Sequence, residues 1–241
     1  MDPLAVLIKK LKEHSSLSQE DLLEIRRLPC SVRELDSHED FIRQGDRPKV
    51  SAIVVEGMLA RYHLLPNGAR QYLSFHLAGD MPDSQCLFID VMDHAVCAIG
   101  KAVVASVPHR DLIKLFDSRP KVGAAIWRET LVDAAIFREA ITNSSARSAP
   151  ARMAHLFCEL FYRSRASGLA RGDTCVLPIG LNQLGEALGL SLATVNRALA
   201  NLRDSDLADF KSGSLTIKNW AGLADCGEFN PRYLHLRRQP F

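Results

Sequence analysis

One segment of the chain, residues 180–203, restricts the fold more than any other, because its residues are spaced as two short helices joined by a tight turn. The first helix has an apolar face at helical spacing, formed by Leu184, Ala187 and Leu188. Gly189 follows where this helix must stop, and Ser191 is a suitable N-cap for the next one. The second helix has its own apolar stripe, formed by Val195, Ala198, Leu199 and Leu202. The spacing therefore predicts a helix-turn-helix.

The second predicted helix leaves a small or polar face exposed, formed by Ala193, Thr194, Asn196, Arg197, Ala200 and Asn201. Such a face fits the major groove of DNA, where the first turns of a recognition helix meet the base edges. The alternative is that the two helices only pack within a helical domain, since pairs of short amphipathic helices also occur in proteins that bind no nucleic acid.

A predicted β-hairpin follows the helix pair and favours the DNA-binding interpretation. Residues 209–218 alternate apolar and polar side chains around Ser212-Gly213, a residue pair typical of tight turns. A hairpin directly after a recognition helix is a wing, whose lysines are expected to approach phosphates. The predicted DNA-binding residues are Ser191, Ala193, Thr194, Asn196, Arg197, Asn201, Lys211 and Lys218.

The composition bounds the class of protein. With 241 residues, of which 47% are hydrophobic and 24% charged, the chain has the composition of a soluble globular protein and the length for two domains. Its apolar runs are shorter than the ~20 residues of a membrane span. Residues 1–12 form a charged amphipathic start without a cleavage site. We therefore expect a cytoplasmic protein with no membrane partner.

The charges and the cysteines give weaker indications. Residues 146–241 carry 12 Lys and Arg against 8 Asp and Glu, so the basic excess lies in the part with the predicted helix-turn-helix. The six cysteines show no C-x-x-C or other metal-ligand spacing. In a cytoplasmic protein we expect them to be reduced and mostly buried, with a redox role for one of them as the alternative.

Residues 32–107 are predicted to form a β-rich domain. Short apolar alternations are separated by glycines that recur every 11 or 12 residues, the rhythm of successive strands in a sandwich or barrel. Asn67-Gly68 predicts a hairpin. The implied architecture is an antiparallel β-roll, which can enclose a small ligand. Two helices are expected before it, over residues 4–11 and from a capping box at Ser18-Gln-Glu-Asp21 to about Arg27.

A helix of about 20 residues is predicted to open at Ser118–Pro120 and to run to about Ile141. It is apolar on two sides. One stripe consists of Val122, Ile126, Val132 and Ile136, and the other of Ala124, Trp127, Leu131, Ala134 and Ile141. We expect one side to pack on the β-roll and the second stripe to form a dimer interface, whereas the alternative buries the whole helix in one core. Residues 143–150 are predicted to be a hinge, followed by a helix over residues 151–165.

The predicted fold is α+β and has three parts: a sensor-like antiparallel β-roll or jelly roll with N-terminal helices (residues 1–117), a long dimerisation helix with hinge (118–145) and a C-terminal winged helix-turn-helix (146–241). This order resembles the Crp/Fnr family of bacterial transcription regulators over nearly the whole chain. Residues 184–197 match the family's DNA-binding signature in spacing, while residues 92–95 and 227–236 are similar to an α-proteobacterial subgroup whose signal is generally unassigned. The resemblance implies a homodimer on a near-palindromic DNA site, with RNA polymerase as a further partner.

The family's recognition helix typically offers a glutamate, then a serine or glycine and an arginine, to the bases. Ala193, Asn196 and Arg197 occupy these positions here. The resemblance implies a bidentate contact of Arg197 to guanine and allows Asn196 to read adenine, whereas Ala193 accepts no hydrogen bond from cytosine. We therefore do not expect the DNA site to carry the family's usual base pair at the position that this glutamate reads. Gly180 also stands where relatives usually have a capping Thr or Ser.

The resemblance also defines a candidate effector pocket, formed by Gly79, Asp80, Asp93 and His94. Cyclic-nucleotide members need a Gly-Glu for the ribose and an Arg-Ser for the phosphate. Gly79 and Asp80 imitate the first pair, but the arginine is absent and an aspartate stands near the phosphate position. We expect no tight binding of cyclic AMP, and the effector stays unidentified. The N-terminal cysteine cluster of iron–sulfur members is also absent.

We expect that the protein is not an enzyme and that it binds neither a cofactor nor a metal. His63, His76 and His94 are potential ligands, but structural histidines are more common. A cupin-like metalloenzyme is the remote alternative, since the roll has no H-x-H pair and the chain has no G-x-S-x-G motif or Gly-rich phosphate loop. Two modes of regulation stay open: a ligand that shifts the populations of hinge geometries, or ligand-independent control by abundance or by oxidation of a cysteine.

Overall fold

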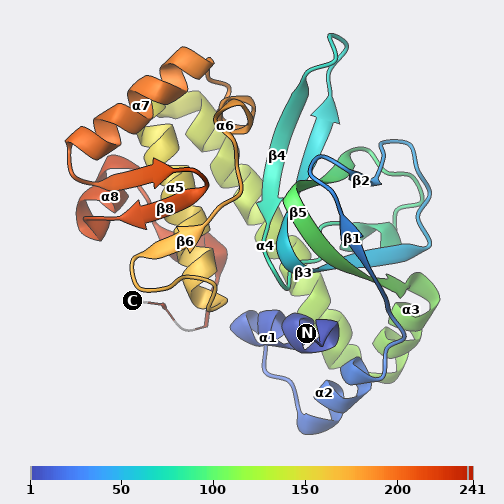
Figure 1. The fold of residues 1–241 in the computed structure, drawn as a ribbon. Helices are drawn as coiled ribbons and strands as arrows, with labels where there is room; N and C mark the ends of the chain where they lie inside the picture. Colours follow the sequence, from blue (N-terminus) through green and yellow to red (C-terminus); the bar gives the residue numbers. More distant parts are fainter. Residues whose placement is uncertain (1, 238, 241) are drawn as a thin grey trace. The chain divides into compact units, whose positions relative to one another are not determined.

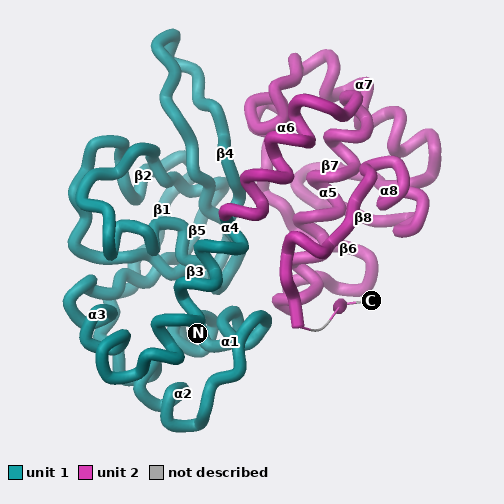
Figure 2. The backbone as a smooth tube through the Cα atoms, turned by 180° about the vertical axis from the view of Figure 1, so that it is seen from behind, with its two compact units in different colours: residues 1–133 teal, residues 134–241 magenta. Residues whose placement is uncertain are grey.

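The computed structural model describes residues 2–237 and 239–240 and divides the chain into two compact units, residues 1–133 and 134–241 (Figures 1 and 2). None of the helices among the described residues combines the length and the apolar content that a membrane crossing needs. The elements of unit 1 are α1 (Pro3–His14), α2 (Gln19–Arg26), β1 (Ser31–Leu35), β2 (Asp40–Ile42), β3 (Val50–Leu64), β4 (Arg70–His76), η1 (Ser84–Leu87), β5 (Ala95–Pro108), α3 (His109–Ser118) and the first half of α4 (Pro120–Ala146).

The sheet of unit 1 is antiparallel, with the strand order β1-β5-β3-β4 and with β2 also paired to β5. The two long strands β3 and β5 lie side by side, and their register shifts on both sides of Glu56. Gly57 follows with φ +80°, and a Cβ there would lie 2.5 Å from the carbonyl oxygen of Lys101. This bulge bends the long strand, because an extra residue interrupts the ladder and increases the local twist. The predicted antiparallel β-roll is confirmed.

Several local predictions in unit 1 are confirmed. The β3–β4 hairpin closes around Asn67-Gly68, with Leu64 paired to Arg70, and it extends from the roll in Figure 1. The capping box of α2 is formed, since the Ser18 and Asp21 side chains each accept a hydrogen bond from the other residue's backbone N–H. The helix α3 was not predicted. It begins directly after Pro108 without a capping side chain, so no start signal separates it from the strand.

The core of unit 1 forms where the helices cover the sheet. Apolar side chains from α1, α3 and the first half of α4 pack with residues of β3 and β5, among them Leu7, Leu11, Ile53, Val107, Leu112, Val122 and Ile126. These side chains are all buried, so the sequence periodicity of the three helices is explained by one shared core.

The predicted hinge is shorter in the structure. Residues 143–146 belong to α4, where the hydroxyl groups of Thr142, Ser144 and Ser145 donate hydrogen bonds to carbonyl oxygens of the preceding turn. These hydroxyl groups have their hydrogen-bond partners within the helix, and the helix continues through them to Ala146. Only Arg147 and Ser148 separate α4 from α5 (Ala149–Ala166).

Unit 2 contains the end of α4 and a smaller helical domain with a three-stranded antiparallel sheet of order β6-β8-β7. Its helix α5 lies at the centre, and Phe157 and Phe161 of this helix are among the largest fully buried side chains. The further elements are β6 (Thr174–Val176), α6 (Leu181–Leu188), α7 (Leu192–Asp204), β7 (Ala208–Lys211), β8 (Ser214–Ile217), α8 (Trp220–Cys226) and η2 (Pro231–Leu234). The winged helix-turn-helix predicted from the sequence is therefore present.

Candidate nucleic-acid interface

The turn between α6 and α7 is built on two glycines. Gly189 ends α6 in the left-handed conformation, with φ 65° and ψ 37°, and its N–H donates to the carbonyl of Gly185. A Cβ at Gly185 would lie 2.6 Å from the carbonyl oxygen of Leu190, so only glycine lets the turn approach this helix so closely. The sequence predicted the role of Gly189 but not that of Gly185, whose requirement depends on the folded turn.

The helix α7 begins at the predicted cap and buries the predicted stripe. The Ser191 side chain accepts a hydrogen bond from the backbone N–H of Thr194 at 3.3 Å. Val195, Ala198 and Leu202 are buried, while Leu199, which was predicted with them, is only half-buried. On the other face, Ala193, Asn196, Arg197 and Asn201 are exposed, and Thr194 and Ala200 are half-buried.

The two candidate base readers are held by hydrogen bonds within their own helix. Arg197 Nη2 donates to Thr194 Oγ1 at 3.0 Å, and Asn196 Nδ2 donates to the Leu192 carbonyl at 3.0 Å. A guanidinium has five N–H donors, so Arg197 can keep this bond and still present two donors to guanine. The Asn196 amide has a second N–H donor and a carbonyl acceptor, so it can also keep its bond to Leu192 and still present polar atoms to a base.

The wing consists of β7 and β8, joined by Ser212 and Gly213 with φ values of 51° and 76°. Two consecutive residues of positive φ are the requirement of the tight hairpin turn that the sequence predicted. The Leu177 N–H donates to the Gly213 carbonyl at 2.7 Å, which ties the wing turn to the segment after β6. The two wing lysines differ. Lys211 is exposed, whereas Lys218 forms an ion pair with Asp206 at 3.0 Å, so its charge is already compensated.

Gln183 is a capping residue of α6 that the sequence analysis missed. Its side-chain oxygen accepts a hydrogen bond from the backbone N–H of Gly180 at 2.7 Å, which caps the helix start although Gly180 has no side chain of its own. A glutamine three residues after the cap position is the signal that could have identified this bond.

The predicted effector residues in unit 1 form two pairs with different partners. Asp80 is buried, accepts a hydrogen bond from the Leu77 N–H at 2.8 Å and lies 3.2 Å from Lys10 Nζ of α1. A Cβ at Gly79 would lie 2.7 Å from Lys10 Cβ, so this pair faces the N-terminal helix. His94 Nδ1 lies 2.6 Å from Asp93 Oδ1, and burial lowers the pKa of His94. His76, a further potential ligand, is buried beside Ser74, while His63 is exposed.

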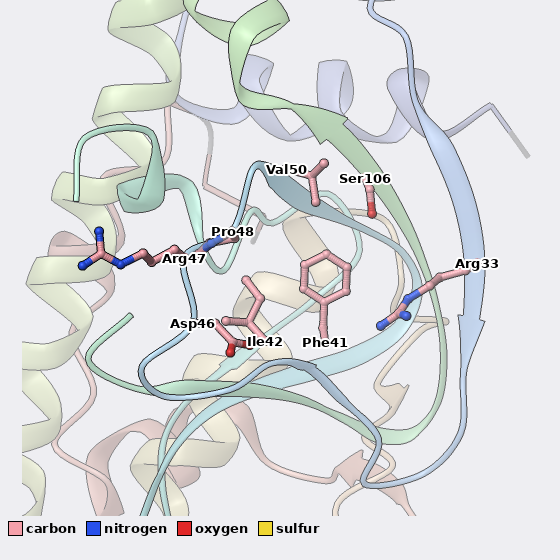
Figure 3. Close-up of a pocket in the computed structure, with 8 residues that line it drawn as sticks. All are labelled: Arg33, Phe41, Ile42, Asp46, Arg47, Pro48, Val50 and Ser106. Carbon is pink, nitrogen blue, oxygen red and sulfur yellow. The ribbon is translucent and has the colours of Figure 1, made fainter. Parts of the chain in front are cut away.

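A cavity of about 430 Å³ lies elsewhere on unit 1 and is lined by Arg33, Phe41, Ile42, Asp46, Arg47, Pro48, Val50 and Ser106. The guanidinium of Arg33 lies 5.2 Å from the centre of the Phe41 ring (Figure 3). The Arg47 side chain points away from the cavity (Figure 3). The four predicted effector residues are not among the residues that line this cavity.

Arg61 of β3 is buried and forms hydrogen bonds to the segment between β4 and β5 and to α4. Arg61 Nε donates to the Pro82 carbonyl at 2.6 Å, and its Nη2 donates to Asp133 Oδ2 on α4 at 2.8 Å. Next to Pro82, Asp83 is fully buried and accepts a hydrogen bond from the Ala52 N–H at 2.8 Å. Burial raises the pKa of Asp83 to about 7. The hydrogen bonds from Arg61 to Pro82 and from Ala52 to Asp83 therefore hold the segment between β4 and β5 in place.

All six cysteines are free; four of them are buried, Cys226 is half-buried and Cys30 is exposed. Burial raises the pKa of every one of these thiols, to about 11 for Cys97 and Cys175. Because the thiolate is the form that reacts with oxidants, these shifts disfavour the redox alternative.

Two family models match the chain, in the same order as its two folded parts. A cyclic nucleotide-binding domain matches residues 32–119, and a Crp-like helix-turn-helix domain matches residues 151–226. The first match covers the strands of the roll with α3, and the second covers α5, the helix pair, the wing and α8.

The relatives found by comparison span nearly the whole chain. The fumarate and nitrate reduction regulatory protein of Vibrio cholerae serotype O1 is 25% identical over 210 residues, which cover 87% of this chain and 84% of the relative. The transcriptional activator protein FnrA of Stutzerimonas stutzeri is 23% identical over 208 residues, which cover 86% of this chain and 85% of the relative.

Among solved structures, FixK2 from Bradyrhizobium japonicum superposes with a TM-score of 0.73 at 25% identity, covering 83% of this chain and 98% of that one. The relatives are regulators and not enzymes, in agreement with the sequence analysis. The two domain matches, the similarity along the chain and the shared fold lead to one conclusion: the chain belongs to the Crp/Fnr family of DNA-binding transcription regulators.

Proposed function

We propose that the chain binds a near-palindromic DNA site as a homodimer, with α7 of each copy in one of two successive major grooves about 34 Å apart. The observation that carries this proposal is the exposed face of α7, where Asn196 and Arg197 follow the Ser191 cap within two turns. On this face Arg197 reads guanine and Asn196 reads adenine, while Ser191, Thr194 and Asn201 contact the DNA backbone. Lys211 contacts the DNA backbone from the wing. Ala193 leaves one base pair without a polar reader, and Lys218 contributes only if it leaves Asp206.

The second copy is proposed to cover the exposed stripe of α4. Trp127, Leu131 and Ile141 are 56%, 51% and 67% exposed, although they are large and apolar, whereas Val122, Ile126, Val132 and Ile136 on the other side are buried. Ala124 is also exposed and Ala134 half-buried, so small side chains accompany the large ones. Such a stripe on a long helix is suited to helix pairing around a twofold axis.

Selection of binding sites from a pool of random duplexes tests the proposal. We expect a consensus with twofold symmetry, whose half-sites lie one helical turn apart, with a guanine and an adenine among its fixed positions. Selection of an asymmetric consensus would contradict the dimer arrangement, and recovery of no consensus would contradict sequence-specific binding.

For the control of DNA binding, we propose a ligand-independent mode over gating by a cyclic nucleotide. The observation that favours it is the internal pairing of Asp80 with Lys10 and of Arg61 with Asp133, since these charges are then satisfied without a ligand. We expect cyclic AMP at millimolar concentration to leave the affinity for the selected duplex unchanged. A saturable increase in affinity would contradict this mode.

The remaining parts of the proposal follow from the role in transcription. RNA polymerase is the proposed protein partner, in line with the name of the FnrA relative, a transcriptional activator. We propose the cytoplasm as the location, because the DNA partner lies there. Functionally, residues 1–117 are assigned to the sensor-like roll, 118–145 to dimerisation and 146–241 to DNA binding.

A further inference from the structure

The segment after α8, residues 227–236, packs onto α5 and completes the core of unit 2. A Cβ at Gly227 would lie 2.6 Å from the backbone nitrogen of His155, so the two backbones touch. His155 Nδ1 lies 3.0 Å from the Gly227 carbonyl, and the Tyr233 hydroxyl donates to Glu159 Oε2 at 3.0 Å. Leu234 is buried. We refer to residues 227–236 as the C-terminal segment.

One buried arginine connects this segment to the junction between α4 and α5. Arg147 Nη2 donates to Glu139 Oε1 at 2.7 Å, and Arg147 Nε lies 3.4 Å from Glu228 Oε2. Arg147 Nη1 also donates to Asn143 Oδ1 at 3.4 Å. Arg147 is one of the two residues between the helices, so its side chain pairs the end of α4 with the C-terminal segment at the point where the chain changes direction.

A second arginine connects the same junction to the helix-turn-helix. Arg152 Nε donates to the Arg147 carbonyl at 2.9 Å, and Arg152 Nη1 donates to the Leu188 carbonyl at 3.3 Å. Leu188 is the last residue of α6 and precedes Gly189 in the turn that sets the direction of α7. One planar guanidinium thus joins the junction to the turn, a geometry that a lysine does not reproduce.

We propose that Arg147 and Arg152 are positioning residues that fix the recognition helix relative to α4, with the C-terminal segment acting as the clamp that holds Arg147. Neither residue contacts DNA in this arrangement. Their contribution is to restrict the angle of the α4–α5 junction, and in a dimer this angle sets the distance between the two recognition helices. The proposal rests on the dimeric DNA binding proposed above.

The decisive measurement is the affinity for duplexes that carry the selected half-sites separated by spacers of different length. The wild type should prefer one spacer. In Arg147→Ala and Arg152→Ala, we expect the preferred duplex to be bound roughly two- to thirtyfold more weakly, while neighbouring spacers are bound nearly as well as the preferred one. The base preference within each half-site should stay unchanged, because α7 keeps its face.

Arg171→Ala is the matched control, because it removes one exposed positive charge from the same unit and lies outside the clamp. It should keep the spacer preference of the wild type. Arg147→Lys retains the charge without the fork and should resemble Arg147→Ala. Thermal unfolding of each variant separates loss of positioning from loss of folding.

If Arg147→Ala does not fold, Glu228→Gln tests the proposal in its place. The Glu228 side chain is 70% exposed, so replacing its carboxylate with an amide leaves no unpaired carboxylate in the interior, and the variant should fold. If folded Arg152→Ala and Glu228→Gln both retain a single preferred spacer, the proposed positioning role of the two arginines and of the C-terminal segment is contradicted. A wild type that selects no paired half-sites would instead overturn the proposed function, so the two failures are distinguishable.

Discussion

Asp83 and Arg197 show how differently a single side chain is determined in the two units. Arg197 was identified from its position on a predicted helix, and the structure exposes it as expected. Asp83 was not among the predicted site residues, because an aspartate after a proline is usually part of an exposed turn. Its complete burial depends on β3, because Asp83 accepts a hydrogen bond from the backbone N–H of Ala52, 31 residues earlier in the chain.

Asp83→Asn tests the cost of this burial. Burial raises the pKa of Asp83 from 3.8 to about 7, so between these values the folded chain holds a proton that the unfolded chain has released. The free energy of unfolding should therefore fall as the pH rises through this range, by up to about 1.4 kcal/mol for each pKa unit. Asparagine is neutral and keeps an acceptor for Ala52, so the variant should lose the part of this pH dependence that Asp83 contributes.

Urea unfolding between pH 4.5 and 8, followed by circular dichroism, measures the effect. Asp90→Asn, at an exposed aspartate of the same loop, is the control and should retain the slope of the wild type. An unchanged slope in Asp83→Asn would show that Asp83 is ionised throughout the range.

Arg197→Ala tests base reading by α7. We expect the variant to lose about 1–3 kcal/mol of binding free energy on the selected duplex and to accept other bases at one position in each half-site. Lys211→Ala, at an exposed wing lysine, should weaken binding to all sequences about equally, since phosphates carry no base information. Competition with single-base variants of the duplex measures both, and an equal loss on selected and random duplexes would remove Arg197 from the base readers.

At the scale of elements, the sequence was most informative where structure depends on neighbours along the chain. The caps at Ser18 and Ser191, the turn at Ser212-Gly213 and the stop at Gly189 each involve bonds across two to four residues, and all four are present. The helix α3 was missed, because it lacks such a signal at its start, and the end of α4 was predicted too early, because its serines bond within the helix.

The two glycines of the helix-turn-helix allow a test at this scale. Gly189→Ala meets open space but must keep a positive φ, so we expect a loss of about 1–2 kcal/mol of stability with α7 still in place. Gly185→Ala introduces a methyl group against the Leu190 carbonyl, and the turn must move to accommodate it. DNA affinity should therefore fall much further in Gly185→Ala than in Gly189→Ala, at a temperature where both are folded. Similar affinities in the two variants would show that the turn does not need this close approach.

For the whole molecule, the exposed side of α4 makes an assembly prediction. Leu131→Glu places a charge in the centre of the apolar stripe, and we expect it to shift the chain from dimer to monomer, because a buried unpaired charge opposes association. Ala140→Glu introduces the same side chain at an exposed position off the stripe and should leave the dimer intact. Sedimentation equilibrium measures the two masses, and a dimeric Leu131→Glu or a monomeric wild type would contradict the arrangement.

The sequence by itself determined the order of the elements, the helix-turn-helix with its wing, the two apolar sides of α4 and the family. These depend on periodicity and on caps and turns, which are short-range interactions that the local sequence encodes. Only the tertiary structure decided that Asp80 faces Lys10 and that Arg152 reaches the Leu188 carbonyl 36 residues away. Such pairings form when whole surfaces are buried together, so their partners are set by the packing of the fold and leave no mark in the residues that surround them along the chain.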